Sequence, residues 1–144
     1  MSNKSPTTLV LVIIGVAVGF CIQLVAVAVG LPLLMGIDMA LNPAGASEFH
    51  AEGLFWGFLL ALLSTPAGMV TGAVTGLAGI FGARTWLQMT LVGTIPALLG
   101  GFAAFLPFLS MGQPNFIVPV TVSIASVLVA VVVARIGSSK RRVE

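Results

Sequence analysis

The sequence predicts an all-α integral membrane protein, a single domain over residues 1–144 with four transmembrane helices packed through small residues. Two observations carry this prediction. Of the 144 residues, 58% are apolar and only 7% are charged, whereas charged residues make up about 25% of a typical soluble domain. The apolar residues also form runs long enough for bilayer crossings of about 20 residues each. The expected spans are approximately 8–36, 53–82, 86–109 and 116–137.

The first span is almost wholly apolar and is interrupted only by Cys21 and Gln23. On a helix, Gly15, Gly19 and Gln23 share one face. An amide turned toward lipid would leave its polar groups unpaired, so Gln23 is expected to face another helix or a polar cavity. Two interpretations stay open, an interhelical hydrogen bond and a contact to a substrate or ion.

The segment 37–52 is the predicted outer loop, and it is rich in acidic residues. It contains Asp38, Glu48, His50 and Glu52. Ser47 is a plausible N-cap of the second helix, and carboxylates in a first turn are favoured by the helix dipole. The alternative is a metal site built on His50. One histidine with no cysteine nearby is a thin ligand set, so no metal and no cofactor is predicted.

The second span, 53–82, contains the stretch around which the other helices are expected to pack. Pro66 lies near its middle and predicts a kink. The hydroxyls of Ser64 and Thr65 are expected to bond the carbonyls that proline frees. Beyond the kink, small residues recur on one narrow helical face, where they let two backbones come close. This face consists of Gly68, Gly72, Thr75, Gly76, Gly79 and Gly82.

The third and fourth spans repeat this pattern with other small residues. The third contains Gly93 and Gly100 at helical spacing, and the fourth is rich in valine. The predicted packing residues are Gly15, Gly19, Gln23, Gly68, Gly72, Gly76, Gly79, Gly93 and Gly100. Similar Leu-Pro segments, at Leu31-Pro32 and Leu106-Pro107, end two helices of the same direction. A duplication of a two-helix hairpin therefore stays open.

The basic residues predict the orientation of the chain in the membrane. In a four-span topology every lysine and arginine falls on one side of the membrane. The two loops on the opposite side, 37–52 and 110–115, contain no lysine or arginine. The basic residues are Lys4, Arg84, Arg135, Lys140, Arg141 and Arg142. By the positive-inside rule, both termini and the tail 138–144 are expected to be cytoplasmic. The location expected is the plasma (inner) membrane.

Function is only partly constrained by these residues. No acidic residue lies within a predicted span, and His50 has no plausible serine or cysteine partner, so an enzyme is not expected. A formal charge of +2 is too small for nucleic-acid binding. The first hypothesis is a structural or accessory subunit that packs in the bilayer against itself or a larger complex. The alternative is a small transporter or channel for a neutral or small solute near the Pro66 break. Its pathway residues would be Gln23, Thr65, Thr71 and Thr75.

Overall fold

The computed structural model describes residues 6–41, 52–110 and 117–141, which are almost entirely helical. The elements in chain order are α1 (Pro6–Val25), the π-helical segment η1 (Ala26–Gly30), α2 (Leu31–Leu41), α3 (Glu52–Leu77), α4 (Trp86–Ser110) and α5 (Ile117–Arg141). Within the described residues, three helical stretches are long and apolar enough to cross a membrane, namely Thr8–Gly30, Trp86–Pro107 and Ile117–Ser139. The all-helical, membrane-type fold class is therefore confirmed.

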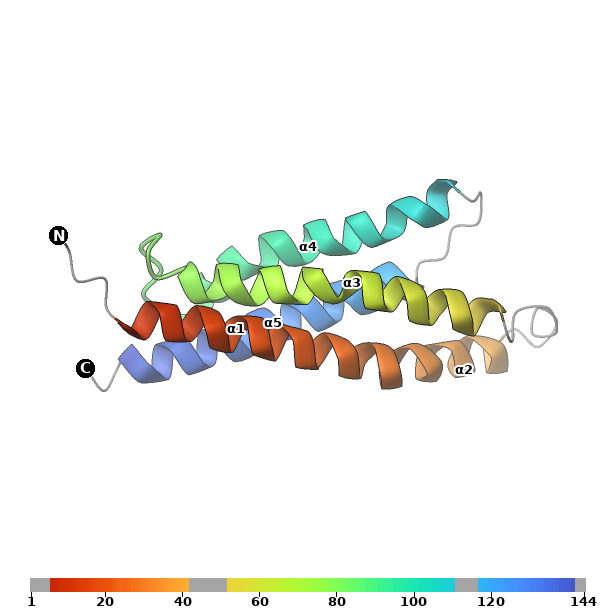
Figure 1. Ribbon diagram of the computed structural model, residues 1–144, viewed down its shortest axis with the longest axis horizontal. Coiled ribbons are helices and arrows are strands. Elements are labelled where there is room, and N and C mark those ends of the chain that lie inside the picture. Colours follow the sequence, from red (N-terminus) through yellow and green to blue (C-terminus); the bar gives the residue numbers. More distant parts are fainter. Residues whose placement is uncertain (1–5, 42–51, 111–116, 142–144) are drawn as a thin grey trace.

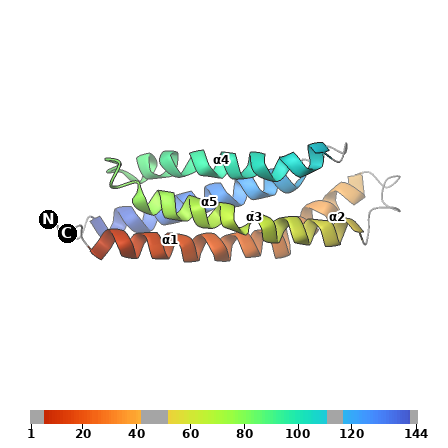
Figure 2. The same ribbon diagram turned by 45° about the horizontal axis from the view of Figure 1, so that its top comes forward.

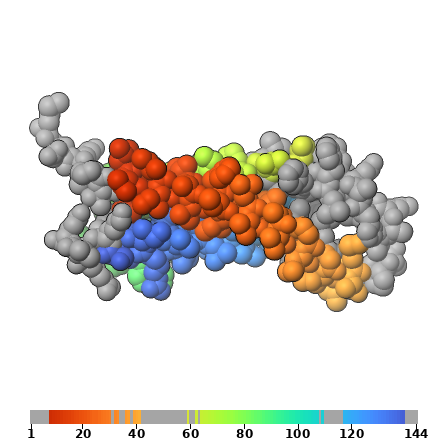
Figure 3. All heavy atoms as spheres, turned by 60° about the horizontal axis from the view of Figure 1, so that its bottom comes forward, coloured from red at the N-terminus to blue at the C-terminus, as the bar shows by residue number. Residues whose placement is uncertain are grey.

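Four rods, α1, α3, α4 and α5, lie side by side as a bundle (Figure 1). Helix α3 contacts each of the other three, and α5 packs against both α1 and α4. The beginning of α1 and the end of α5 lie at the same end of the bundle (Figure 1), and these two helices run alongside each other on the face seen in Figure 3.

The first helical rod bends near Pro32, where no kink was predicted from the sequence. Residues 26–30 form the π-helical turn η1, which ends two residues before Pro32. In a regular α-helix the ring of Pro32 would crowd the carbonyl of Ala28, and a wider turn relieves that contact. Beyond it, α2 leaves the line of α1 (Figure 2) and continues to Leu41. The predicted outer loop 37–52 therefore begins as helix.

Helix α3 runs as one continuous helix through Pro66. A proline at this position removes the N–H group that would bond the carbonyl of Leu62. The hydroxyl of Thr65 donates to that same carbonyl at 2.8 Å. Compensation of the freed carbonyl by Thr65, expected from the sequence, is therefore confirmed, and it accounts for the continuity of the helix at Pro66.

The α-helix ends at Leu77, five residues before the predicted boundary at residue 82. A capping turn follows, in which the N–H of Ala83 donates to the carbonyl of Ala78 at 3.1 Å and that of Gly82 to Gly79 at 3.4 Å. Gly82 has φ +82°. This is the hydrogen-bond pattern of a Schellman motif, whose left-handed residue stops the helix. Gly79 and Gly82 were predicted on the helical packing face and lie instead in this turn.

Substitution of Gly82 by alanine should destabilise the turn between α3 and α4. A Cβ is disfavoured at positive φ by about 1–2 kcal/mol, while nothing lies within 4 Å of the Cβ that would be added. The loss is therefore conformational, and Gly82→Asn should cost less than Gly82→Ala because asparagine tolerates this region. Unfolding of the purified protein in detergent micelles would measure both. Equal losses for the two variants would contradict the assignment.

Two apolar clusters lie at different heights of the core. One contains the buried residues Ala78, Ala83, Met89 and Ala134, and the other contains Val118 and Val122 with Ala67, Ala104 and Ile117 packed on them. Along α3 and α5, the residues between these clusters include fully buried polar side chains. Those with no exposed surface are Thr71, Thr75 and Ser126, and Gln23 of α1 is equally buried. Polar groups therefore gather in the middle of the bundle.

Candidate functional site

Glycines of α1 lie directly against small positions of α3. The contacting pairs are Gly15 with Gly72, Gly19 with Gly68, and Leu11 with Gly76. A Cβ added at Gly72 would collide with the backbone of Gly15, and one added at Gly68 would lie 2.7 Å from the carbonyl oxygen of Gly19. Backbones come this close only where side chains are absent. The predicted small-residue faces of these two helices are thus turned toward each other.

Gln23 lies at one end of this row of contacts and is completely buried. Its Nε2 donates a hydrogen bond to Ser64 Oγ at 3.3 Å, which links α1 to α3. A Cβ added at Gly68 would lie 3.2 Å from both Cβ and Oε1 of Gln23, so the glycine makes room for the amide. Among the described residues, Oε1 has no hydrogen-bond partner. Gln23 therefore faces another helix, one of the two environments expected from the sequence.

The threonines of the hypothetical pathway differ in how their hydroxyls are used. The hydroxyl of Thr65 donates to the Leu62 carbonyl at 2.8 Å, and that of Thr75 donates to the Thr71 carbonyl at 2.7 Å. Both bonds are local to α3. The hydroxyl of Thr71 is fully buried and has no partner in the described part of the chain. Of the four candidate residues, Gln23 and Thr71 thus each have a buried polar atom with no partner among the described residues.

The predicted small residues of α4 also point into the bundle. A Cβ added at Gly93 would collide with Thr75 Oγ1 and lie 2.8 Å from Ala130 Cβ, and one added at Gly100 would lie 2.6 Å from Ala67 Cβ. Gly101 was not predicted, yet it lies against Ser123 of α5. The Gly100-Gly101 pair could have signalled this, because consecutive helical residues point about 100° apart and so serve two neighbours.

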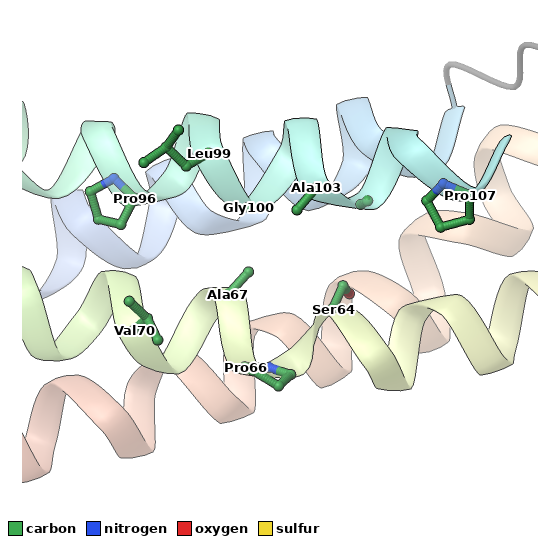
Figure 4. A pocket seen from close by; sticks show the side chains of 10 residues that line it. Ser64, Pro66, Ala67, Val70, Pro96, Leu99, Gly100, Ala103 and Pro107 are labelled. Atoms are coloured by element: carbon green, nitrogen blue, oxygen red, sulfur yellow. The ribbon is translucent and has the colours of Figure 1, made fainter. Parts of the chain in front are cut away.

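A groove of about 490 Å³ lies between α3 and α4 (Figure 4). It is lined by small residues and prolines, together with two larger apolar side chains and one hydroxyl. The lining consists of Ser64, Pro66, Ala67, Val70, Pro96, Leu99, Gly100, Ala103, Ala104 and Pro107. Ser64 connects the groove to the interior, because its hydroxyl also accepts the hydrogen bond from Gln23.

The acidic segment cannot be placed in this site. Glu48 and His50 lie outside the described residues, as do the side chains of Asp38 and Glu52. The predicted capping roles and the alternative metal site therefore stay predictions. Comparison of the chain with models of protein families, with curated proteins and with solved structures finds no match.

Proposed function

We propose that the chain is a structural or accessory subunit of a membrane complex, with α3 as the fourth span and both termini cytoplasmic. The 26 residues of α3 match the length of a membrane crossing, and α3 packs against α1, α4 and α5. At the end of the bundle where α1 begins, the guanidinium of Arg135 lies 4.4 Å from the ring centroid of Trp86. Tryptophan is typical of both membrane interfaces and arginine of the cytoplasmic one, so Arg135 supports this orientation.

The observation that carries the proposal is the groove between α3 and α4. Between α1 and α3 the small residues are already in contact with each other, as at Gly15 and Gly72. Along the groove, Ala67, Gly100 and Ala103 lie beside a volume of about 490 Å³, and Ala103 is exposed. Small residues allow close approach of a further helix in lipid. The proposed occupant is an uncharged transmembrane helix of a partner protein, because the groove wall contains no charged side chain.

Filling the groove should release the partner without unfolding the bundle. Ala103→Phe places a bulky ring in the groove, and Ala17→Phe, at an exposed alanine of α1, is the matched control. The mass of the complex purified from its native membrane would be measured for each. A defined hetero-complex is expected for the unsubstituted chain and for Ala17→Phe, and a lone bundle for Ala103→Phe. A lone bundle in all three preparations, or a complex that survives Ala103→Phe, would contradict the proposal.

A second candidate function, passage of a small neutral solute, is favoured by the buried polar atoms. Gln23 Oε1 and Thr71 Oγ1 have no partner among the described residues, and such atoms are costly in a membrane interior. In this hypothesis they contact a solute that moves through the middle of the bundle. The Gln23 variant described in the Discussion tests it.

A further inference from the structure

Two buried hydroxyls on neighbouring helices have no hydrogen-bond partner in the described ranges. They belong to Thr71 of α3 and Ser126 of α5, both with no exposed surface. Other helical threonines donate to the carbonyl four residues earlier, at 2.7–2.9 Å. These are Thr75, Thr90, Thr94 and Thr121. Such back-bonding is the usual way for a helical hydroxyl to be satisfied. Thr71 and Ser126 depart from that pattern.

Contacts on either side fix the height of these two hydroxyls in the bundle. Gly93 of α4 lies against Thr75 of α3 and Ala130 of α5. About two helical turns further along α4, Gly100 lies against Ala67 of α3. These contacts define two layers, in each of which antiparallel helices meet at a glycine of α4.

Thr71, Ala97 and Ser126 occupy the layer between them. The first layer contains Thr75, Gly93 and Ala130. Thr71 lies four residues from Thr75, Ala97 four from Gly93, and Ser126 four from Ala130. Residues four apart in a helix lie on one face, about one turn apart. Ala97 is completely buried and contributes only a methyl group. The layer therefore combines two hydroxyls with one small apolar side chain.

We propose that this layer is a binding site for a water molecule, which bridges Thr71 Oγ1 and Ser126 Oγ beside the methyl of Ala97. Both hydroxyls are uncharged and can each donate and accept a hydrogen bond. The matching ligand is a small neutral molecule that does the same. Buried waters make about three hydrogen bonds, of which these two hydroxyls would account for two. The bridge ties α3 to α5 without direct contact between the two side chains.

Detection of water in the full chain is the first test. Nuclear Overhauser contacts between water and protein would be recorded in detergent micelles, with Thr71→Val/Ser126→Ala as the double variant and Thr94→Val as the matched control. The unsubstituted chain should show contacts from water to the Thr71 methyl and the Ser126 β protons. Thr94→Val should retain them, and the double variant should lose water contacts to the neighbouring Ala97 methyl. Absence of water in the unsubstituted chain, or its persistence in the double variant, would overturn the proposal.

A thermodynamic cycle gives an independent readout. Thr71→Val and Ser126→Ala should be non-additive, with a coupling of about fivefold in the unfolding equilibrium, as expected for one hydrogen-bonded connection. Additive effects would show that each hydroxyl bonds only its own helix and would overturn the bridge. Coupling without detectable water would indicate a direct bond between the hydroxyls and would overturn it too.

Discussion

Gly72→Ala is expected to force α1 away from α3 and to destabilise the bundle more than any other single methyl addition to these helices. The added Cβ would collide with the carbonyl oxygen of Gly15, which belongs to a helix backbone and cannot rotate away. Overpacking of a close-packed core costs about 1–3 kcal/mol. The value for Gly72→Ala should lie at the upper end of that range, because one whole helix has to move.

Gly36→Ala is the matched control for this substitution. Gly36 is also helical, but nothing lies within 4 Å of the Cβ that would be added. There the methyl should be neutral or stabilise by up to about 1 kcal/mol, since alanine is the better helix former. Unfolding in mixed micelles with increasing denaturing detergent would compare the two. Similar stability of Gly72→Ala and Gly36→Ala would contradict the backbone contact between α1 and α3.

Gln23→Leu is expected to weaken the α1–α3 contact by about 0.6–2 kcal/mol, the range measured for interhelical hydrogen bonds in membranes. The substitution removes the bond from Nε2 to Ser64 Oγ. It also places a branched side chain against Gly68, in the space beside its Cα that the Gln23 amide occupies. A double-mutant cycle with Ser64→Ala, followed by unfolding in micelles, should return a coupling in the same range. Additive losses would show that the Gln23–Ser64 bond contributes nothing.

The same variant separates the two proposed functions. Uptake of small neutral solutes would be measured in vesicles reconstituted with either protein. If Gln23 only packs, vesicles with Gln23→Leu and vesicles with the unsubstituted chain should both match protein-free vesicles. A flux that depends on the unsubstituted chain and falls in Gln23→Leu, while the folded bundle persists, would establish the pathway and contradict a purely structural role.

The helical faces could be predicted from the sequence, but their partners could not. Gly15 and Gly19, or Gly68 and Gly72, recur at helical spacing, and that spacing alone puts each pair on one face. Which face meets which depends on how four rods are arranged, and no residue pattern encodes this for helices of such similar composition. The Gly15–Gly72 register thus emerges only from the structure.

Local helix geometry was predicted less well, for reasons that differ between prolines. At Pro66 the neighbouring Thr65 hydroxyl satisfies the freed carbonyl, whereas Pro32 follows the π-helical turn. The early end of α3 depends on the positive φ of Gly82. The sequence does not distinguish Gly82 from the other glycines at helical spacing before it.

The start of α4 can be predicted from the sequence, since Thr85 and Gln88 form a capping box with reciprocal bonds of 3.2 Å. The direction of the Thr71 hydroxyl is a rotamer choice that no sequence pattern gives.

The π-helical turn η1 has a geometric effect on everything that follows it. A turn closed by i→i+5 bonds holds one residue more than an α-turn. The side chains after Gly30 therefore point about 100° away from where a regular α-helix would direct them. In an unbroken α-helix Leu33, Ile37 and Leu41 would continue the face that carries Gly15 and Gln23. In α2, which leaves the line of α1, all three are exposed. The extra residue acts as a phase shift within one rod. The glycine contacts between α1 and α3 can therefore be kept while the residues that α2 exposes vary.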